Sequence, residues 1–142
     1  MPELEMDLSS GIAAFEAKHF AKAMQLLSPL ANDGNAEAQY RMAIMFQNGL
    51  GCAKNDVAAL KWMQASADQG HALAQHGMGF MYLHGECVEK NAQKALQWFR
   101  LAAEQGLSGS CMMIGMIYEQ GLGVEINTDE AKKWYQLAES KG

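Results

Sequence analysis

Four consecutive residues, His84-Gly85-Glu86-Cys87, bring an imidazole, a carboxylate and a thiol close together in the sequence. These groups are the usual ligands of zinc, and His76 lies two helical turns upstream. A structural zinc site normally has four ligands, however, and no second cysteine or histidine pair at a recognisable spacing supplies the rest. We therefore expect no metal site. Cys87 then replaces a small residue in a turn, and His84 faces solvent or a binding groove.

A second stretch with possible chemistry is Gly49-Leu50-Gly51, which looks like the start of a phosphate-binding loop. It lacks the Gly-Lys-Ser/Thr ending of such loops, and no strand is expected before it. Hydrolase signatures are missing as well: the sequence has no Ser-x-x-Lys, no Gly-x-Ser-x-Gly and no His-Glu-x-x-His. The sequence thus predicts no catalytic residues, no cofactor and no enzymatic activity.

Composition limits the classes of protein that remain. The chain has 142 residues, of which 49% are hydrophobic and 19% charged, which predicts one folded domain and excludes a disordered chain. No apolar run approaches the roughly 20 residues that span a bilayer, so we expect no membrane partner. The formal net charge is −5, and the basic residues are scattered, which argues against a nucleic-acid partner.

The cysteine count and the first residues bear on the compartment. Cys52, Cys87 and Cys111 are odd in number and irregularly spaced, so free thiols are expected. The sequence starts with MPELEMDLSS, which is acidic and has neither the basic nor the apolar part of a secretory signal. We expect a cytoplasmic protein, or a periplasmic or secreted one if a signal has been removed.

The stretch around Gly49 is part of an internal repeat. It recurs 36 residues later as HGECVEKNAQKALQWFRLAAEQG and again as QGLGVEINTDEAKKWYQLAESKG. A fixed period of this length is typical of stacked helical repeats. The columns that recur are glycine at 34, 70, 106 and 142 and at 49, 85 and 121, asparagine at 55, 91 and 127, alanine at 59, 95 and 131, and tryptophan at 62, 98 and 134.

Each repeat predicts two short helices. In the first copy, one helix runs from about Glu37 to Gln47, and Gly49 follows it as a left-handed cap. The second helix opens near Asn55 or Asp56, whose side chains can accept hydrogen bonds from the first-turn amides, and it ends before Gly70. In the last copy we expect Thr128 and Asp129 to provide this cap. Helices this short are marginal alone, so they must stack.

The recurring small residues carry a family resemblance. A first column holds Ala43, Gly79 and Gly115, with Phe46, Tyr82 and Tyr118 three residues later. This order matches the L-G-x-x-Y element of tetratricopeptide repeats, and the alanine column of the second helix matches A-x-x-x-F. The longer connections GLGCAKN, GECVEKN and GLGVEIN, with the recurring tryptophan, resemble the Sel-one-like repeat, a tetratricopeptide-like family. The resemblance covers Gly34 to Gly142.

The resemblance implies a fold. We expect an all-α, right-handed superhelical solenoid of about eight antiparallel helices in a single domain over residues 1–142. The expected parts are a tetratricopeptide-like helix pair at 4–33 and three Sel-one-like repeats at 34–69, 70–105 and 106–142. Trp62, Trp98 and Trp134 are expected to pack between helix pairs.

The same resemblance implies a binding surface, because in tetratricopeptide-like arrays one set of side-chain columns on the first helices lines a concave face. Methionine and aromatic side chains suit such a face, since they adapt to varied apolar partners. The alternative is that these side chains pack on one another and form core. The predicted partner-binding residues are Tyr40, Ile44, Gln47, His76, Phe80, Leu83, His84, Met112, Met116 and Glu119.

The function that follows is a non-catalytic adaptor or scaffold, which binds a peptide or helix of a partner protein on its concave face. One alternative is a self-assembling structural protein. Trp134 lies in the last helix, which no further repeat covers, so the chain is expected to be a monomer or a weak homodimer through the C-terminal helix pair. A metal-binding or hydrolytic repeat protein is a third alternative.

Overall fold

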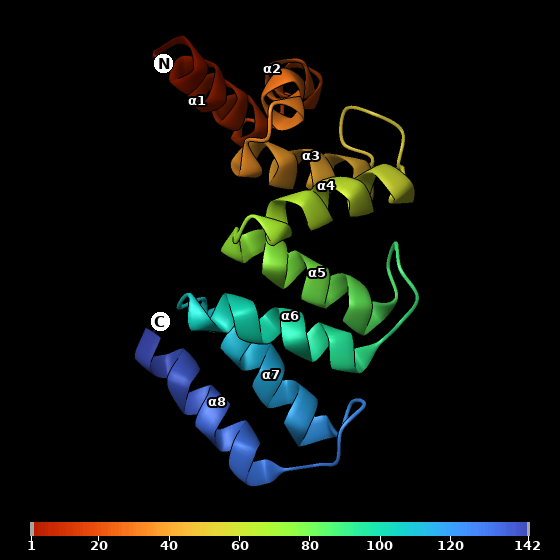
Figure 1. Ribbon diagram of the computed structural model, residues 1–142, viewed down its shortest axis with the longest axis vertical. Helices are drawn as coiled ribbons and strands as arrows, with labels where there is room; N and C mark the ends of the chain where they lie inside the picture. The colour runs from red at the N-terminus through yellow and green to blue at the C-terminus, as the bar shows by residue number, and fades with distance from the viewer. Residues whose placement is uncertain (1, 142) are drawn as a thin grey trace. The chain divides into compact units, whose positions relative to one another are not determined.

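The computed structural model describes residues 2–141, and over that range it contains eight α-helices and no strand (Figure 1). The helices form four antiparallel pairs, the first with the second, the third with the fourth, the fifth with the sixth and the seventh with the eighth, as the repeat pattern predicts. The helices are α1 (Pro2–Glu16), α2 (Phe20–Asn32), α3 (Ala36–Asn48), α4 (Asp56–Asp68), α5 (Ala72–His84), α6 (Ala92–Glu104), α7 (Ser108–Gln120) and α8 (Thr128–Lys141).

The chain divides after His71 into two compact units. Unit 1 contains α1 to α4, which are the tetratricopeptide-like pair and the first long repeat. Unit 2 contains α5 to α8, which are the second and third long repeats. The division therefore falls between repeats, and each unit has a hydrophobic core of its own.

The core of unit 1 forms between α1, α2 and α3. Leu27 and Met45 are fully buried in it, and the rings of Phe15 and Phe20 meet edge to face with their centroids 5.5 Å apart. Gly11 permits the close approach of α1 and α2, because a β-carbon there would lie 2.5 Å from Leu27 Cδ2. Trp62 of α4 packs on this core from outside and is half-buried.

The core of unit 2 shows why the small residues recur. A β-carbon added to Gly79 would lie 2.7 Å from the ring of Phe99, and one added to Gly115 would lie 2.6 Å from the ring of Tyr135. In both repeats of this unit, the missing side chain on the first helix therefore leaves room for an aromatic ring of the second helix. Phe99 is fully buried, and Trp134 is half-buried against the same core.

The second helix of every long repeat begins at the recurring column of asparagines. The side chain of Asn55 accepts a hydrogen bond from the amide of Ala58 at 3.0 Å, and Asn91 and Asn127 make the same contact in the later copies. The prediction that Thr128 and Asp129 cap the last helix is wrong. Asn127 holds that position, since its side chain accepts a hydrogen bond from the amide of Glu130 at 3.0 Å.

The first helices end in left-handed turns. Gly49, Gly85 and Gly121 have φ angles of 65° to 69°, a region that favours glycine. Two residues later, Gly51 and Gly123 also have positive φ, and in the middle copy Cys87 adopts the same conformation with φ 65°. Cys87 therefore occupies the turn position that the sequence predicted for a small residue.

Candidate partner-binding surface

Three of the exposed large apolar side chains of unit 2 lie on its first helices, α5 and α7, and the other three, Leu101, Ile126 and Leu137, lie elsewhere in the unit. Leu73 and Phe80 of α5 are 44% and 39% exposed, and Met112 of α7 is 56% exposed. Residues 73, 80 and 84 share one face of α5, since seven and four residues bring the chain round to nearly the same side. The rings of Phe80 and His84 lie 4.3 Å apart between centroids, so this face carries a continuous aromatic surface.

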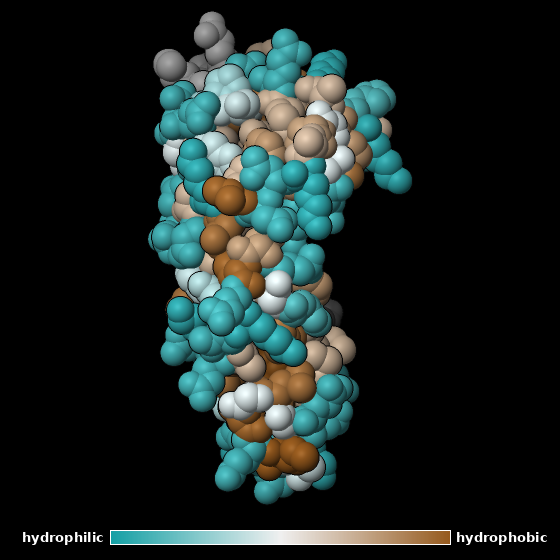
Figure 2. All heavy atoms as spheres, turned by 90° about the vertical axis from the view of Figure 1, so that its right-hand side faces the viewer, coloured by the Kyte–Doolittle hydropathy of each residue, from teal (hydrophilic) through white to brown (hydrophobic). Residues whose placement is uncertain are grey.

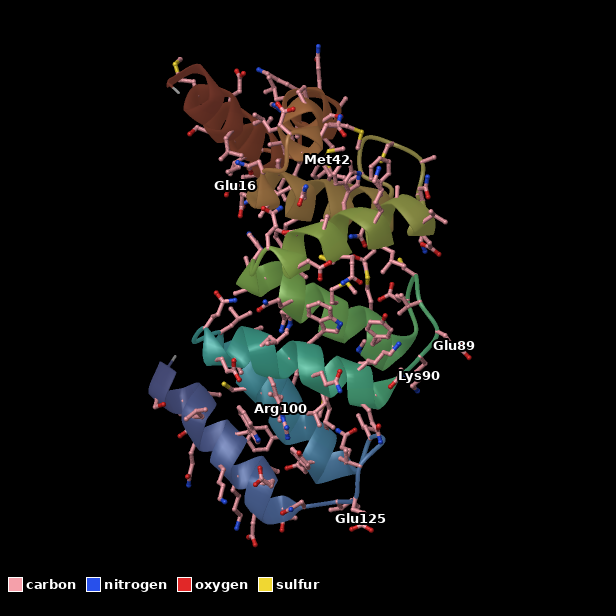
Figure 3. All side chains as sticks on the ribbon, in the orientation of Figure 1. Glu16, Met42, Glu89, Lys90, Arg100 and Glu125 are labelled. Carbon is pink, nitrogen blue, oxygen red and sulfur yellow. The ribbon has the colours of Figure 1, made fainter. Side chains whose placement is uncertain are left out.

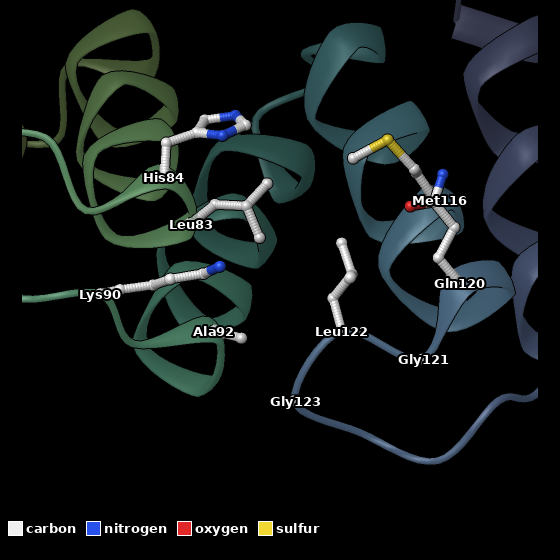
Figure 4. A pocket seen from close by; sticks show the side chains of 9 residues that line it. All are labelled: Leu83, His84, Lys90, Ala92, Met116, Gln120, Gly121, Leu122 and Gly123. Carbon is white, nitrogen blue, oxygen red and sulfur yellow. The ribbon is translucent and has the colours of Figure 1, made fainter.

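A pocket opens beside this face, between the C-terminal ends of α5 and α7 and the connections that follow them (Figure 4). Its volume is about 440 Å³. Leu83, Met116 and Leu122 point into it from different sides and form an apolar floor. We call this site the α5–α7 pocket; its lining consists of Leu83, His84, Lys90, Ala92, Met116, Gln120, Gly121, Leu122 and Gly123.

The packing of the α7–α8 connection creates one wall of the pocket. A β-carbon on Gly123 would lie 2.5 Å from the β-carbon of Ala92, the first residue of α6. The amide of Leu122 donates a hydrogen bond to the carbonyl of Ile117 at 3.0 Å. The contact between Gly123 and Ala92 holds the α7–α8 connection against the start of α6, and the hydrogen bond holds Leu122 against the end of α7. This wall of the pocket is therefore an ordered part of unit 2.

Three of the predicted partner residues, Leu83, His84 and Met116, line this pocket. Figure 2 shows the surrounding surface from the side of the helix connections. Apolar side chains gather there over unit 2 between hydrophilic ones. His84 is exposed at the rim and Met116 is half-buried, whereas Leu83 is only 4% exposed and belongs mainly to the core. Glu119 is exposed and interacts with Tyr135, whose pKa is raised first by burial and then by that carboxylate.

His76, another predicted partner residue, is engaged inside unit 2. Its Nδ1 lies 2.7 Å from the hydroxyl of Ser110 on α7, and its ring lies 5.1 Å from that of Phe99. Burial lowers the pKa of His76, so the neutral imidazole is favoured at neutral pH. The residue joins α5 to α7 and leaves only part of its ring for another molecule.

The corresponding residues of unit 1 lie on α3. Tyr40, Ile44 and Gln47 are half-buried there. The ring of Tyr40 stacks on His71 with centroids 4.9 Å apart, and burial raises the pKa of Tyr40. His71 Nε2 lies 2.6 Å from Glu37 Oε2. Tyr40 thus takes part in the internal packing of unit 1 and exposes one edge.

Glu37 is the centre of the polar contacts on this part of α3. It also accepts a hydrogen bond from Arg41 at 2.9 Å. Burial raises the pKa of Glu37, but the hydrogen bonds from His71 and Arg41 outweigh that effect, and the pKa is lowered. Leu73 and Leu107 stand at the equivalent positions of Glu37 and His71 in the second repeat. The polar pair is therefore specific to the first long repeat.

The residues that the connections contribute to the pocket were not predicted from the sequence. Lys90 and Leu122 lie outside the helices, and their approach to α5 and α7 depends on the fold. One signal was present, since the connections are longer than in a tetratricopeptide repeat and they recur with the same length. A connection of constant length is expected to pack at a constant place.

The candidate metal and thiol chemistry is also placed by the structure. Among the side chains that the structure describes, no three His, Cys, Asp or Glu residues are grouped so that they could hold a metal ion. Cys111 is buried in the unit 2 core, Cys52 and Cys87 are half-buried, and all three are reduced. Burial raises the pKa of Cys52, which disfavours its thiolate.

No helix within the described range is long and apolar enough to cross a membrane.

The repeats match a known family. The model of the Sel1 repeat matches residues 36–71, 72–107 and 108–142, which begin two residues after the units defined by the recurring glycines. The chain belongs to the Sel1 repeat family. Sel1 repeat proteins are generally scaffolds for protein interactions, and their fold is typically non-catalytic.

Solved structures agree with this assignment. The chain is 34% identical to a Sel1 repeat protein from Oxalobacter formigenes, with a TM-score of 0.87 over 95% of this chain and 56% of that one. It is 28% identical to c5321, a protective antigen of uropathogenic Escherichia coli strains with an SLR fold, with a TM-score of 0.90 over 96% of this chain and 30% of that one. The predicted all-α repeat solenoid is thus confirmed.

A more distant likeness concerns the fold alone. Protein 5086 of Pseudomonas aeruginosa is 16% identical, with a TM-score of 0.53 over 99% of this chain and 67% of that one. The search of curated proteins found no match.

This chain spans about half of the Oxalobacter protein and less than a third of c5321.

Proposed function

We propose that this Sel1 repeat chain is a non-catalytic protein-binding module, which holds a peptide segment or a helix of a partner on the α5 and α7 face of unit 2. The observation that carries the proposal is the position of Phe80 and Met112. Both are large apolar side chains that stay exposed on the first helices, and the α5–α7 pocket lies beside them. Such side chains suit contacts with varied apolar partners.

The affinity of this surface depends on the apolar area that a partner covers. Removing even about 300 Å² of apolar surface from water is worth roughly 7 kcal/mol before the entropic costs of association, at about 25 cal/mol per Å². Micromolar binding needs about 8 kcal/mol after those costs have been met, so a larger covered area and polar contacts at the rim must supply the difference. His84 and Gln120 line the pocket, are exposed and are available for this role.

The proposal keeps Tyr40, Ile44 and Gln47 as partner contacts of unit 1, because they occupy the same repeat columns. It also keeps the cytoplasm as the predicted compartment and a monomer or weak homodimer as the predicted oligomeric state.

Trp134 is half-buried against the core of unit 2, and the exposed apolar residue nearest to it on α8 is Leu137. Leu137 is therefore the better position for testing self-association.

The test compares captured proteins between the wild type and Phe80→Glu. Both proteins are immobilised, incubated with a lysate of the source cells, and analysed by mass spectrometry. We expect Phe80→Glu to keep its helical circular dichroism and to lose the specific partners, because a charge would have to be buried at the contact. Met112→Glu is a second variant in case the first affects folding.

The control is Val57→Glu, which places the same charge on α4 at an apolar residue that is 81% exposed. It should retain the partners. An unchanged capture profile for both Phe80→Glu and Met112→Glu would show that the α5 and α7 face is not the site. A mass that rises with concentration in light scattering and falls with Leu137→Glu would favour the self-assembling alternative.

A further inference from the structure

We propose that the α5–α7 pocket binds a partner segment in which a bulky apolar side chain is flanked by an acidic side chain, and that Lys90 binds the acidic group. This inference rests on the proposed function and adds the chemistry of the partner. It is carried by three properties of the pocket, which are its apolar floor, the sign of the charge at its rim, and the state of the backbone amides around it.

The floor fits an apolar anchor. Leu83, Met116 and Leu122 converge on a volume of about 440 Å³, which is at the lower end of the roughly 300–1,000 Å³ of ligand pockets. That volume takes a bulky side chain with its neighbour but not a whole helix. The thioether of Met116 can change rotamer to fit the shape of the side chain that enters.

The rim is basic, although the chain as a whole is acidic. Lys90 extends from the α5–α6 connection toward the space between Leu83 and Leu122 (Figure 4), and no Asp or Glu is among the residues that line the pocket. The nearby Glu89 and Glu125 point outward from their connections (Figure 3). In a chain with 16 acidic and 11 basic residues, this arrangement favours an anionic group at the pocket.

The base of the Lys90 side chain is packed against its neighbours, whereas its ammonium group stays available to a partner. An added β-carbon on Gly85 would lie 3.2 Å from the β-carbon of Lys90, so the base of the lysine side chain packs against the turn after α5. Among the described residues, Lys90 takes part in no ion pair. The positive end of α6 adds to the attraction, because its first residue, Ala92, also lines the pocket.

The backbone of the pocket favours an acidic side chain over the carboxylate of a chain terminus. Terminal carboxylates are typically held by several free amides that converge on one point. Here the amides of Gly121 and Leu122 both donate to the carbonyl of Ile117. The charge at this rim therefore comes chiefly from one flexible ammonium group, which suits the side chain of Asp or Glu.

The experiment uses a library of random 12-residue peptides displayed on phage and selected against the full chain. Enriched sequences are then synthesised with amidated ends, and their affinities are measured by fluorescence polarisation. We expect the enriched peptides to carry a large apolar residue with Asp or Glu within three positions. Lys90→Glu should weaken their binding about fivefold, the upper range for a partly exposed ion pair. A peptide with Lys in place of its acidic residue should bind Lys90→Glu better than wild type.

The control is Lys132→Glu, which makes the same charge change at an exposed lysine of α8 outside the pocket and should leave the affinities unchanged. Peptides without an acidic residue, weakened by Phe80→Glu but not by Lys90→Glu, would overturn this inference and leave the proposed function standing. Peptides that bind only with a free C-terminal carboxylate would also overturn it. Failure to enrich any peptide that depends on Phe80 would count against both proposals.

Discussion

At the scale of single residues, the close packing of this Sel1 repeat protein depends on positions where a side chain is missing. Gly79 and Gly115 sit in the middle of α5 and α7, where glycine is unfavourable for the helix itself. The rings of Phe99 and Tyr135 occupy the space above them. Glycine is kept because the aromatic contact contributes more than the helix loses.

The first prediction concerns Gly79→Ala. The new methyl group would lie 2.7 Å from the fully buried ring of Phe99, which cannot move without disturbing the core. We expect the free energy of unfolding to fall by about 1–3 kcal/mol, measured by urea titration. Gly109→Ala is the matched control, because its nearest neighbour is 3.8 Å away. It should be neutral or stabilising by up to about 1 kcal/mol, and equal losses in the two variants would contradict the packing argument.

At the scale of elements, the first two long repeats are each tied together at both ends of the second helix. In the second repeat, the amide of Asn91 donates to the carbonyl of Tyr82 at the end of α5, and its side chain caps α6. At the other end of α6, Gln105 donates a hydrogen bond to the buried Gln75 at 2.9 Å. The first repeat has the same two contacts, through Asn55 and Gln69. The asparagine thus fixes where the connection ends and the helix begins.

The second prediction tests this role of the asparagine. Asn91→Ala removes the bond to the Lys94 amide but keeps the backbone bond to Tyr82, so we expect a loss of about 1 kcal/mol in the free energy of unfolding. Asn91→Asp preserves an acceptor and should stay within a few tenths of a kcal/mol of wild type. Thermal and urea unfolding of the two variants measure the difference. An aspartate variant as unstable as the alanine variant would exclude capping as the cause.

At the scale of the whole molecule, the described residues form two units, each with a separate hydrophobic core. In repeat proteins, stability is close to a sum of contributions from each repeat and from its contacts with its neighbours. A change in one core should therefore act mainly on its own unit.

The third prediction follows from the separate cores. Phe99→Ala should cost about 3–5 kcal/mol in unit 2, and hydrogen exchange with mass spectrometry should show faster exchange in α5 to α8 than in α2 and α3. Leu27→Ala is the reciprocal variant, with faster exchange expected in unit 1. Uniform acceleration along the whole chain in both variants would mean that the two units unfold as one.

Much of the fold could be predicted from the sequence because the signals are local and repeated. The 36-residue period, the glycine after each first helix and the asparagine before each second helix concern a few neighbouring residues, and their physics does not depend on distant contacts. The start of the last helix was assigned to Thr128 and Asp129 because both are good caps in general. The side chain of Asn127 makes that contact instead, and only the structure shows which of these neighbouring side chains bonds to the first-turn amide.

The candidate site was predictable only in part. Helical periodicity placed Phe80, Met112 and Met116 in the side-chain columns that were expected to line the concave face, since periodicity determines which residues share a face. It did not determine that Leu83 is nearly buried, that His76 is bound to Ser110, or that Lys90 and Leu122 close the pocket. These facts depend on how the connections pack against helices distant in sequence. Local sequence thus determined the repeats, whereas the tertiary structure decided which of their side chains remain available to a partner.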